Sequence, residues 1–188
     1  QVNNLNAVSF NSKLNGLGTM AVNTAGNAFD FTANAAQNAF NGVLALGHAT
    51  FELAADNTAA LVNATLKLGA DSITTVGDGV QTIGGLAFDG GTVKFNTGTP
   101  GETVAKSTIH TTKEMNLLGT GTVVVDIDSV DNSQTPVNPV LPIMEQDDAN
   151  TLLQLAVSDV VVQGNGGNLV LKDQDGNVIT DATTADIA

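Results

Sequence analysis

The chain has 188 residues and a formal net charge of −13, because 19 acidic residues outnumber six basic ones, all of them lysines. Nucleic-acid binding requires clustered positive charge, and bidentate phosphate clamps require arginine, so the sequence excludes nucleic acid as a partner. The absence of Trp, Tyr and Cys excludes ring-stacking sites built on Trp or Tyr and any disulfide.

No run of about 18 apolar residues is present, so we predict no transmembrane helix and a chain that is not embedded in a membrane. The first residues show neither the charged nor the apolar region of a signal peptide, so we expect a piece of a longer chain.

Bulky apolar residues recur every 20 to 24 positions over about the first 115 residues. Three such residues in each period are typical of a solenoid whose rungs stack on one another. The three series are Phe10, Phe31, Leu53, Ile73 and Phe95; Leu17, Phe40, Leu61, Ile83 and Val104; and Val22, Leu46, Leu68, Phe88 and Ile109.

Short segments within this repeat alternate apolar residues with Thr and a charged residue, as in residues 48–53, 63–68 and 90–95. This period of two is typical of half-buried strands. We expect the apolar residues to point inward and the polar ones to point to water. The inward set is Phe51, Leu53, Leu66, Leu68, Val93 and Phe95, and the outward set is Thr50, Glu52, Thr65, Lys67, Thr92 and Lys94.

Pairs of Gly, Asn and Asp separate these strands and predict corners with positive φ. The pairs are Asn15-Gly16, Asn41-Gly42, Asp78-Gly79, Gly84-Gly85 and Asp89-Gly90. Only residues 33–37 could be helical, because Gly and Asn recur too often elsewhere. The predicted class is all-β, a single-stranded parallel β-helix with about 22 residues and three strands per rung. A β-sandwich is the rival, which only the 22-residue recurrence argues against.

The spacing of the bulky apolar residues changes near Leu118. We therefore divide the chain into β-helix rungs (1–117) and terminal rungs with a loop and a cap (118–188). Residues 123–127 predict a strong strand, and three prolines within 128–150 predict a loop that leaves the coil. We expect two strands, 152–162 and 169–171, to flank a glycine turn, and a further turn at 173–177 to precede Val178. Such hairpins would cap the open end of the coil.

Three segments resemble the passenger domains of bacterial autotransporters, the type V secretion proteins, and most closely the diffuse-adherence and self-associating adhesins. They are LAFDGGTVKF at 86–95, LLGTGTVVVDID at 117–128 and MEQDDAN at 144–150. The resemblance implies a right-handed coil at the C-terminal end of a passenger, displayed on the cell surface after export through the periplasm and outer membrane. It also implies a C-terminal translocator barrel, absent from this chain, as a partner.

In this family such a region includes an autochaperone segment, which folds first and templates the remaining rungs. The residues that carry this role over here are Leu118, Val123, Val125, Ile127, Leu169 and Leu171. We expect the whole to act in adhesion, between cells or to a surface or in a biofilm. The partner would be a second copy or a host or matrix receptor, and stacked Asn and Thr ladders offer a route to self-association.

Candidate chemistry is sparse, and we predict no enzyme, no cofactor and no metal. His48 and His110 are the only histidines, and neither lies in a nucleophile motif. The sequence at 173–177 begins like a calcium loop, but Thr184 stands where an EF-hand needs Glu. A calcium site among the acidic residues that flank the prolines is a weaker alternative; these are Asp126, Asp128, Asp131, Glu145, Asp147 and Asp148.

Three other functions are open at this stage. The chain could be a non-adhesive stalk of an autotransporter that carries an enzyme upstream. A polysaccharide-processing β-helix enzyme is less favoured, because no arginine and no catalytic cluster are present. An ice-binding solenoid would need Thr-x-Thr on successive rungs, and Thr120-x-Thr122 is not followed by a regular array.

Overall fold

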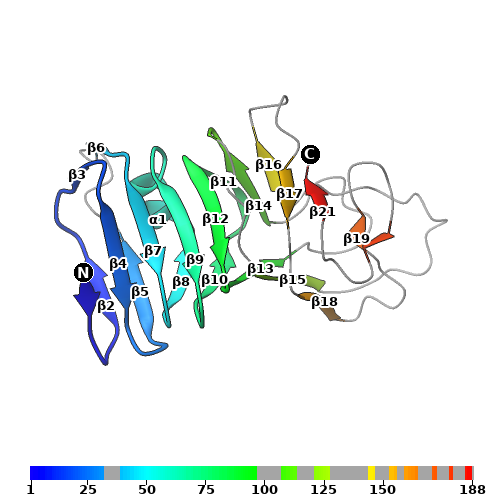
Figure 1. Cartoon of the computed structure of the whole chain (residues 1–188), viewed down its shortest axis with the longest axis horizontal. Helices are drawn as coiled ribbons and strands as arrows, with labels where there is room; N and C mark the ends of the chain where they lie inside the picture. The colour runs from blue at the N-terminus through cyan, green and yellow to red at the C-terminus, as the bar shows by residue number, and fades with distance from the viewer. Residues whose placement is uncertain are drawn as a thin grey trace.

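The computed structural model describes residues 1–31, 39–96, 107–113, 121–127, 144–146, 153–155, 159–164, 171–172, 178–179 and 185–187. In these residues the chain winds into a parallel β-helix with about 22 residues per rung, as the sequence predicts. Figure 1 shows the strands of successive rungs side by side, in chain order from the blue N-terminal end toward the green middle of the chain.

Two long sheets form two sides of the coil. Sheet A consists of β1 (Val2–Asn3), β4 (Thr19–Asn23), β7 (Val43–Leu46), β9 (Thr65–Gly69) and β12 (Gly85–Asp89). Sheet B consists of β2 (Val8–Phe10), β5 (Ala28–Phe31), β8 (Thr50–Leu53), β10 (Ile73–Val76), β13 (Thr92–Asn96), β15 (Thr122–Ile127) and β18 (Asp159–Gly164). Every neighbouring pair in both sheets is parallel, and up to β13 each rung adds one strand to each sheet.

The third side is less regular. It begins with β3 (Asn15–Gly16) beside β6 (Ala39–Phe40) and ends with β11 (Gly79–Ile83), β14 (Ser107–Thr111) and β16 (Met144–Gln146). Between these two groups lies α1 (Ala55–Ala60), a helix in the place where the neighbouring rungs have a strand. The sequence did not predict α1, and the stretch expected to be helical, 33–37, lies outside the described residues.

The hydrogen-bond register confirms much of the predicted stacking. Val22 pairs with Leu46, Leu46 with Leu68 and Leu68 with Phe88, as the third apolar series predicts. Phe10 likewise pairs with Phe31, and the two rings lie 5.8 Å apart. The alternation within residues 48–53, 63–68 and 90–95 is also confirmed, because the apolar residues are buried and the polar ones are half-buried or exposed.

Four predicted members of the apolar series are not confirmed. Ile73 pairs with Thr50 and is half-buried, and Val76, three residues later, pairs with Leu53 instead. Ile109 is buried but pairs with Gln81 on the third side, not with Phe88. Leu17 is 81% exposed, and Val104 lies outside the described residues. From β1 to β13, paired residues of successive rungs in sheets A and B lie 19 to 24 positions apart. On the third side, Gln81 and Ile109 lie 28 positions apart. A fixed spacing therefore selects the wrong residue at Ile73 and at Ile109.

Apolar side chains from all three sides fill the interior. Phe29, Phe31, Leu46, Leu53, Leu66 and Leu68 are among the buried core residues. Burying one such side chain contributes roughly 1.5–3 kcal/mol before the entropy of ordering it is subtracted. The coil is therefore held together by columns of like side chains together with the parallel backbone ladder between rungs.

Glycines at the corners serve two different purposes. Gly16, Gly79 and Gly90 have φ values of +100°, +82° and +92°, which confirms three predicted positive-φ corners. Gly42, in contrast, is required by space, because a Cβ atom there would lie 1.9 Å from the carbonyl oxygen of Gly18. The Asn41-Gly42 pair is thus a point of close approach between rungs and not a left-handed corner.

The C-terminal part differs from the prediction in its pairing. We expected residues 152–162 to form a hairpin with 169–171, but β18 instead extends sheet B in parallel beside β15. Antiparallel pairs do occur, between β17 (Leu153–Leu155) and β21 (Ala185–Ile187), and between β19 (Leu171–Lys172) and β20 (Val178–Ile179). The second pair confirms the hairpin predicted around 173–177. The span expected to be a loop, 128–150, also contributes β16 to the third side.

Within the part of the chain that the structure describes, no helix has the length and apolar character needed to cross a membrane. The predicted division at residue 118 stays a prediction.

Candidate functional site

The outer face of sheet B carries a column of polar side chains that crosses four successive rungs. Asp30 follows Phe29 in β5 and Glu52 follows Phe51 in β8, and these two phenylalanines pair in register. Glu52 pairs with Thr75 in β10, and Thr75 pairs with Lys94 in β13. Because side chains in a strand alternate between its two faces, these four residues point to solvent while their neighbours fill the core.

Charge is separated along this column, which we call the sheet B column (Asp30, Glu52, Thr75 and Lys94). Two carboxylates lie on the N-terminal side of Thr75, and one amine lies on its C-terminal side. Adjacent strands lie about 4.8 Å apart, so Glu52 and Lys94 are each about one strand spacing from Thr75. The sheet B column is therefore an electrically asymmetric face with a neutral residue at its centre.

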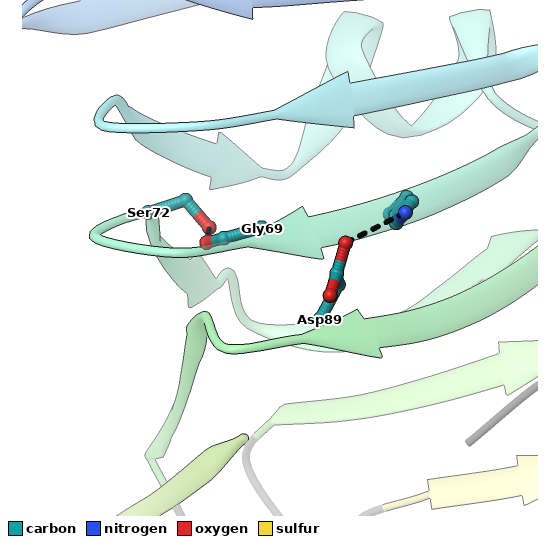
Figure 2. Close-up of polar contacts among 4 residues, drawn as sticks. Gly69, Ser72 and Asp89 are labelled. Carbon is teal, nitrogen blue, oxygen red and sulfur yellow. Dashed lines mark hydrogen bonds and ion pairs between the residues drawn. The ribbon is translucent and has the colours of Figure 1, made fainter. Parts of the chain in front are cut away.

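The outer face of sheet A carries three alanines and one lysine in its central column. Ala21 pairs with Ala45, Ala45 with Lys67 and Lys67 with Ala87. Lys67 Nζ lies 2.7 Å from Asp89 Oδ2, and this ion pair joins β9 to β12, as the dashed line in Figure 2 shows. The two side chains are 41% and 62% exposed. Ion pairs of such exposure contribute at most about 1 kcal/mol, so this pair positions charge more than it stabilises the fold.

The corner that leads from sheet A into sheet B repeats one backbone conformation on successive rungs. Gly26, His48, Asp71 and Gly90 all have positive φ, at +85°, +46°, +60° and +92°. Ser72 closes its corner by donating a hydrogen bond from its hydroxyl to the carbonyl oxygen of Gly69 at 2.6 Å, which Figure 2 shows beside Asp89. These corners line a shallow groove that His48, Asp71 and Gly90 border.

The two histidines lie on different parts of the coil. His48 is an exposed corner residue just before β8, and His110 is half-buried in β14, where it pairs with Thr82 and Glu145. Among the described residues, no three acidic, His or Cys side chains gather closely enough to hold a metal ion. Of the acidic residues weighed for calcium, Asp126 lies in β15 and Glu145 in β16, and the others lie outside the described residues.

The residues expected to promote folding lie in two places. Val123 in β15 is 3% exposed and pairs with Val93 on one side and Val160 on the other. Val125 pairs with Phe95 and Val162, and Ile127 pairs with Gly164. Leu171 lies apart from them in β19, opposite Ile179. Leu118 and Leu169 lie outside the described residues. The structure thus places three of the six residues together on β15, which joins the rungs before it to β18.

A buried polar cluster at α1 was missed by sequence reasoning. Asn57 accepts a hydrogen bond from the Phe31 backbone N–H at 2.7 Å and donates one to the carbonyl oxygen of Glu52 at 2.8 Å. Thr58 Oγ1 and Gln81 Oε1 lie 2.6 Å apart, and the Thr58 hydroxyl is the donor. Short motif patterns do not signal such contacts, because the partners lie 26 and 23 positions away in sequence.

Comparison with known proteins finds relatives without an established activity. The sequence matches no established family profile, and no solved structure is detectably similar. It is 39% identical to the uncharacterized protein YuaQ of Escherichia coli K12 over 174 residues, which cover 92% of this chain and 13% of YuaQ. It is 36% identical to the uncharacterized lipoprotein YdeK of the same organism over 191 residues, which cover 94% of this chain and 14% of YdeK. The chain thus spans about one seventh of the length of these two relatives.

Proposed function

We propose that this chain is a surface-exposed β-helical segment of an autotransporter passenger that acts in adhesion, with its C-terminal part promoting folding during export. Three observations support the proposal. The fold is a parallel β-helix, the segments that resemble autotransporter adhesins form strands β12, β13 and β15, and the relative YdeK is named a lipoprotein. That name favours a place in the cell envelope or on its surface.

The sheet B column is the observation that supports adhesion through a second copy. If two such faces meet antiparallel, with a two-fold axis passing beside Thr75, Glu52 of each copy lies opposite Lys94 of the other. Isologous contacts of this kind use the same patch on both molecules. Glu52 and Lys94 lie one strand to either side of Thr75, so both ion pairs of such a contact can form at once.

One such contact between two molecules is weak, whereas many such contacts between two cells are strong together. Exposed ion pairs contribute roughly 0.2–1 kcal/mol each, so two pairs do not hold two isolated chains together. Many copies displayed on facing cells bind with high effective concentration, and weak contacts then sum to firm attachment. Adhesion of this type weakens as salt screens the charges.

Charge exchange tests the proposal directly. The full-length protein is displayed on non-aggregating bacteria, and clumping is followed by settling of the suspension. We expect Glu52→Lys and Lys94→Glu each to reduce clumping, because like charges then face each other. A mixture of the two variant strains should clump through mixed contacts, in which opposite charges are restored.

Asp56→Lys in α1 is the matched control, since it makes the same charge change away from sheet B. Undiminished clumping of both variants, with normal surface display, would rule out the sheet B column as the adhesive face. If the displayed wild-type protein causes neither clumping nor attachment to surfaces, the chain is better described as a non-adhesive stalk.

A further inference from the structure

The corner that leads from sheet A into sheet B carries a groove of about 600 Å³, which we call the corner groove. Its floor includes an outward position of sheet B, where Ile73 pairs with Thr50 on one side and with Thr92 on the other. All three side chains are half-buried, so two hydroxyl groups flank one apolar residue. His48 and Asp71 border this floor. The corner groove therefore brings hydroxyl, imidazole, carboxylate and apolar surface together, and its volume is typical of sites for small molecules.

His48 and Asp71 adopt a backbone conformation for which the rungs on either side use glycine. Their φ values are +46° and +60°, and Gly26 and Gly90 stand at the equivalent corners. This conformation costs an L-residue energy, although Asp and His adopt it more readily than most. Both side chains are exposed, and among the residues that the structure describes neither has a hydrogen-bond or ion-pair partner. They therefore give the fold nothing that glycine would not, which indicates a role in binding.

The imidazole of His48 leaves the Asp71 carboxylate free. A Cβ atom at Gly26 would lie 3.4 Å from His48 Nε2, so the ring extends toward the preceding rung. Asp71 belongs to the following rung, and Gly90, one rung further, has no side chain to cover it. A carboxylate can accept hydrogen bonds on both oxygens, and an imidazole can donate one or accept one. The corner groove thus offers several hydrogen-bonding groups that point to solvent and are not used by the protein itself.

We propose that the corner groove binds one neutral sugar unit. Asp71 accepts hydrogen bonds from two neighbouring hydroxyls of the sugar, His48 and the threonine hydroxyls bind others, and the apolar face of the ring packs on Ile73. An anionic sugar is disfavoured, because Asp71 and the net charge of −13 repel it. Without Trp or Tyr to stack on, one unit binds with a Kd on the order of 1 mM, which display of many copies strengthens. The corner groove lies beside the sheet B column, so sugar binding does not depend on contacts between two copies.

Saturation-transfer NMR of the purified full-length protein tests the proposal. The probes are the methyl glycosides of glucose, galactose and mannose, with N-acetylneuraminic acid as the anionic probe. We expect a signal from at least one neutral glycoside and none from the acid. Asp71→Asn keeps the shape of the side chain and tolerates positive φ but removes the charge, so it should weaken binding at least about tenfold. Asp56→Asn in α1 is the matched control and should bind as the wild type does.

Denaturant titration separates loss of the sugar-binding group from damage to the corner. Asp71→Gly removes the carboxylate and suits the positive φ, so we expect loss of sugar binding with an unchanged or higher midpoint of unfolding. A lower midpoint would show that Asp71 serves the fold and would overturn the proposal. No signal from any neutral glycoside, a signal from the acid alone, or equal binding by Asp71→Asn and the wild type would overturn it as well. Clumping is measured on the Glu52 and Lys94 variants, so the adhesive role of the sheet B column can fail separately.

Discussion

The backbone N–H of Phe31 donates a hydrogen bond to Asn57 Oδ1 at 2.7 Å, which joins the last residue of β5 to the helix of the following rung. The amide of Asn57 donates in turn to the carbonyl oxygen of Glu52 in β8. The pairing between β5 and β8 runs from Ala28 and Thr50 to Phe29 and Phe51. The buried amide thus connects these two strands of sheet B beyond that point.

Asn57→Ala should lower the free energy of unfolding by about 1–3 kcal/mol, because it leaves the Phe31 N–H and the Glu52 carbonyl without their partner. Denaturant titration of the purified protein measures the change. Asn41→Ala is the control, since Asn41 is exposed and its side chain bonds only the nearby carbonyl of Ala39. Equal loss in both variants would mean that burial of the Asn57 amide adds nothing.

Thr74→Val should raise the free energy of unfolding by up to about 1 kcal/mol. Thr74 is completely buried between Phe51 and Val93, and its hydroxyl has no hydrogen-bond partner. A buried hydroxyl without a partner costs roughly 1–3 kcal/mol, and valine has a similar shape without that group. The same denaturant titration applies, with Thr75→Val at the neighbouring exposed position as the control. A less stable Thr74→Val protein would show that the hydroxyl is satisfied in solution.

Gly42→Ala and Gly18→Ala should change stability in opposite directions. A Cβ at Gly42 would meet the Gly18 carbonyl at 1.9 Å and the Phe40 ring at 2.5 Å, so the rungs must shift apart, which costs about 1–3 kcal/mol or more. A Cβ at Gly18 would meet nothing within 4 Å, and alanine there restricts the unfolded chain, a gain of about 0.4–1 kcal/mol. Thermal unfolding of the two variants measures both effects, and a neutral Gly42→Ala would contradict the close approach of these rungs.

Val123→Asp should prevent the upstream rungs from becoming resistant to protease during export of the full-length protein. The substitution places a charge in the buried position between Val93 and Val160, where no partner compensates it. Surface display and limited proteolysis together give the measurement. Thr122→Asp, at the half-buried position next to it, is the control. Protected upstream rungs in Val123→Asp would leave β15 with a purely structural role and no part in templating.

Sequence reasoning failed where rung length and long-range pairing decide the outcome. Ile73 and Val76 are both apolar and both near the expected spacing, and only the hydrogen bonds between β8 and β10 decide that Val76 stacks on Leu53. The step from Gln81 to Ile109 is longer than a standard rung, so the spacing rule assigned Ile109 to the wrong side. Helix α1 has six residues, too few to be stable alone, so packing of Ala60 and Asn57 in the coil stabilises it.

The candidate site, too, could be predicted only in part from the sequence. The alternation that points Glu52, Lys67 and Lys94 outward is a local property of each strand and can be read from the sequence. That Glu52 and Lys94 lie in one column on either side of Thr75, while Lys67 lies on another sheet beside Asp89, depends on the register between rungs.

The sequence by itself therefore determined the class of fold and the alternation of inward and outward residues within residues 48–53, 63–68 and 90–95. Only the tertiary structure decided which outward residues share a face and where a helix replaces a strand. The physical reason is that side-chain alternation arises within a strand, whereas stacking arises from hydrogen bonds between rungs whose connecting segments differ in length.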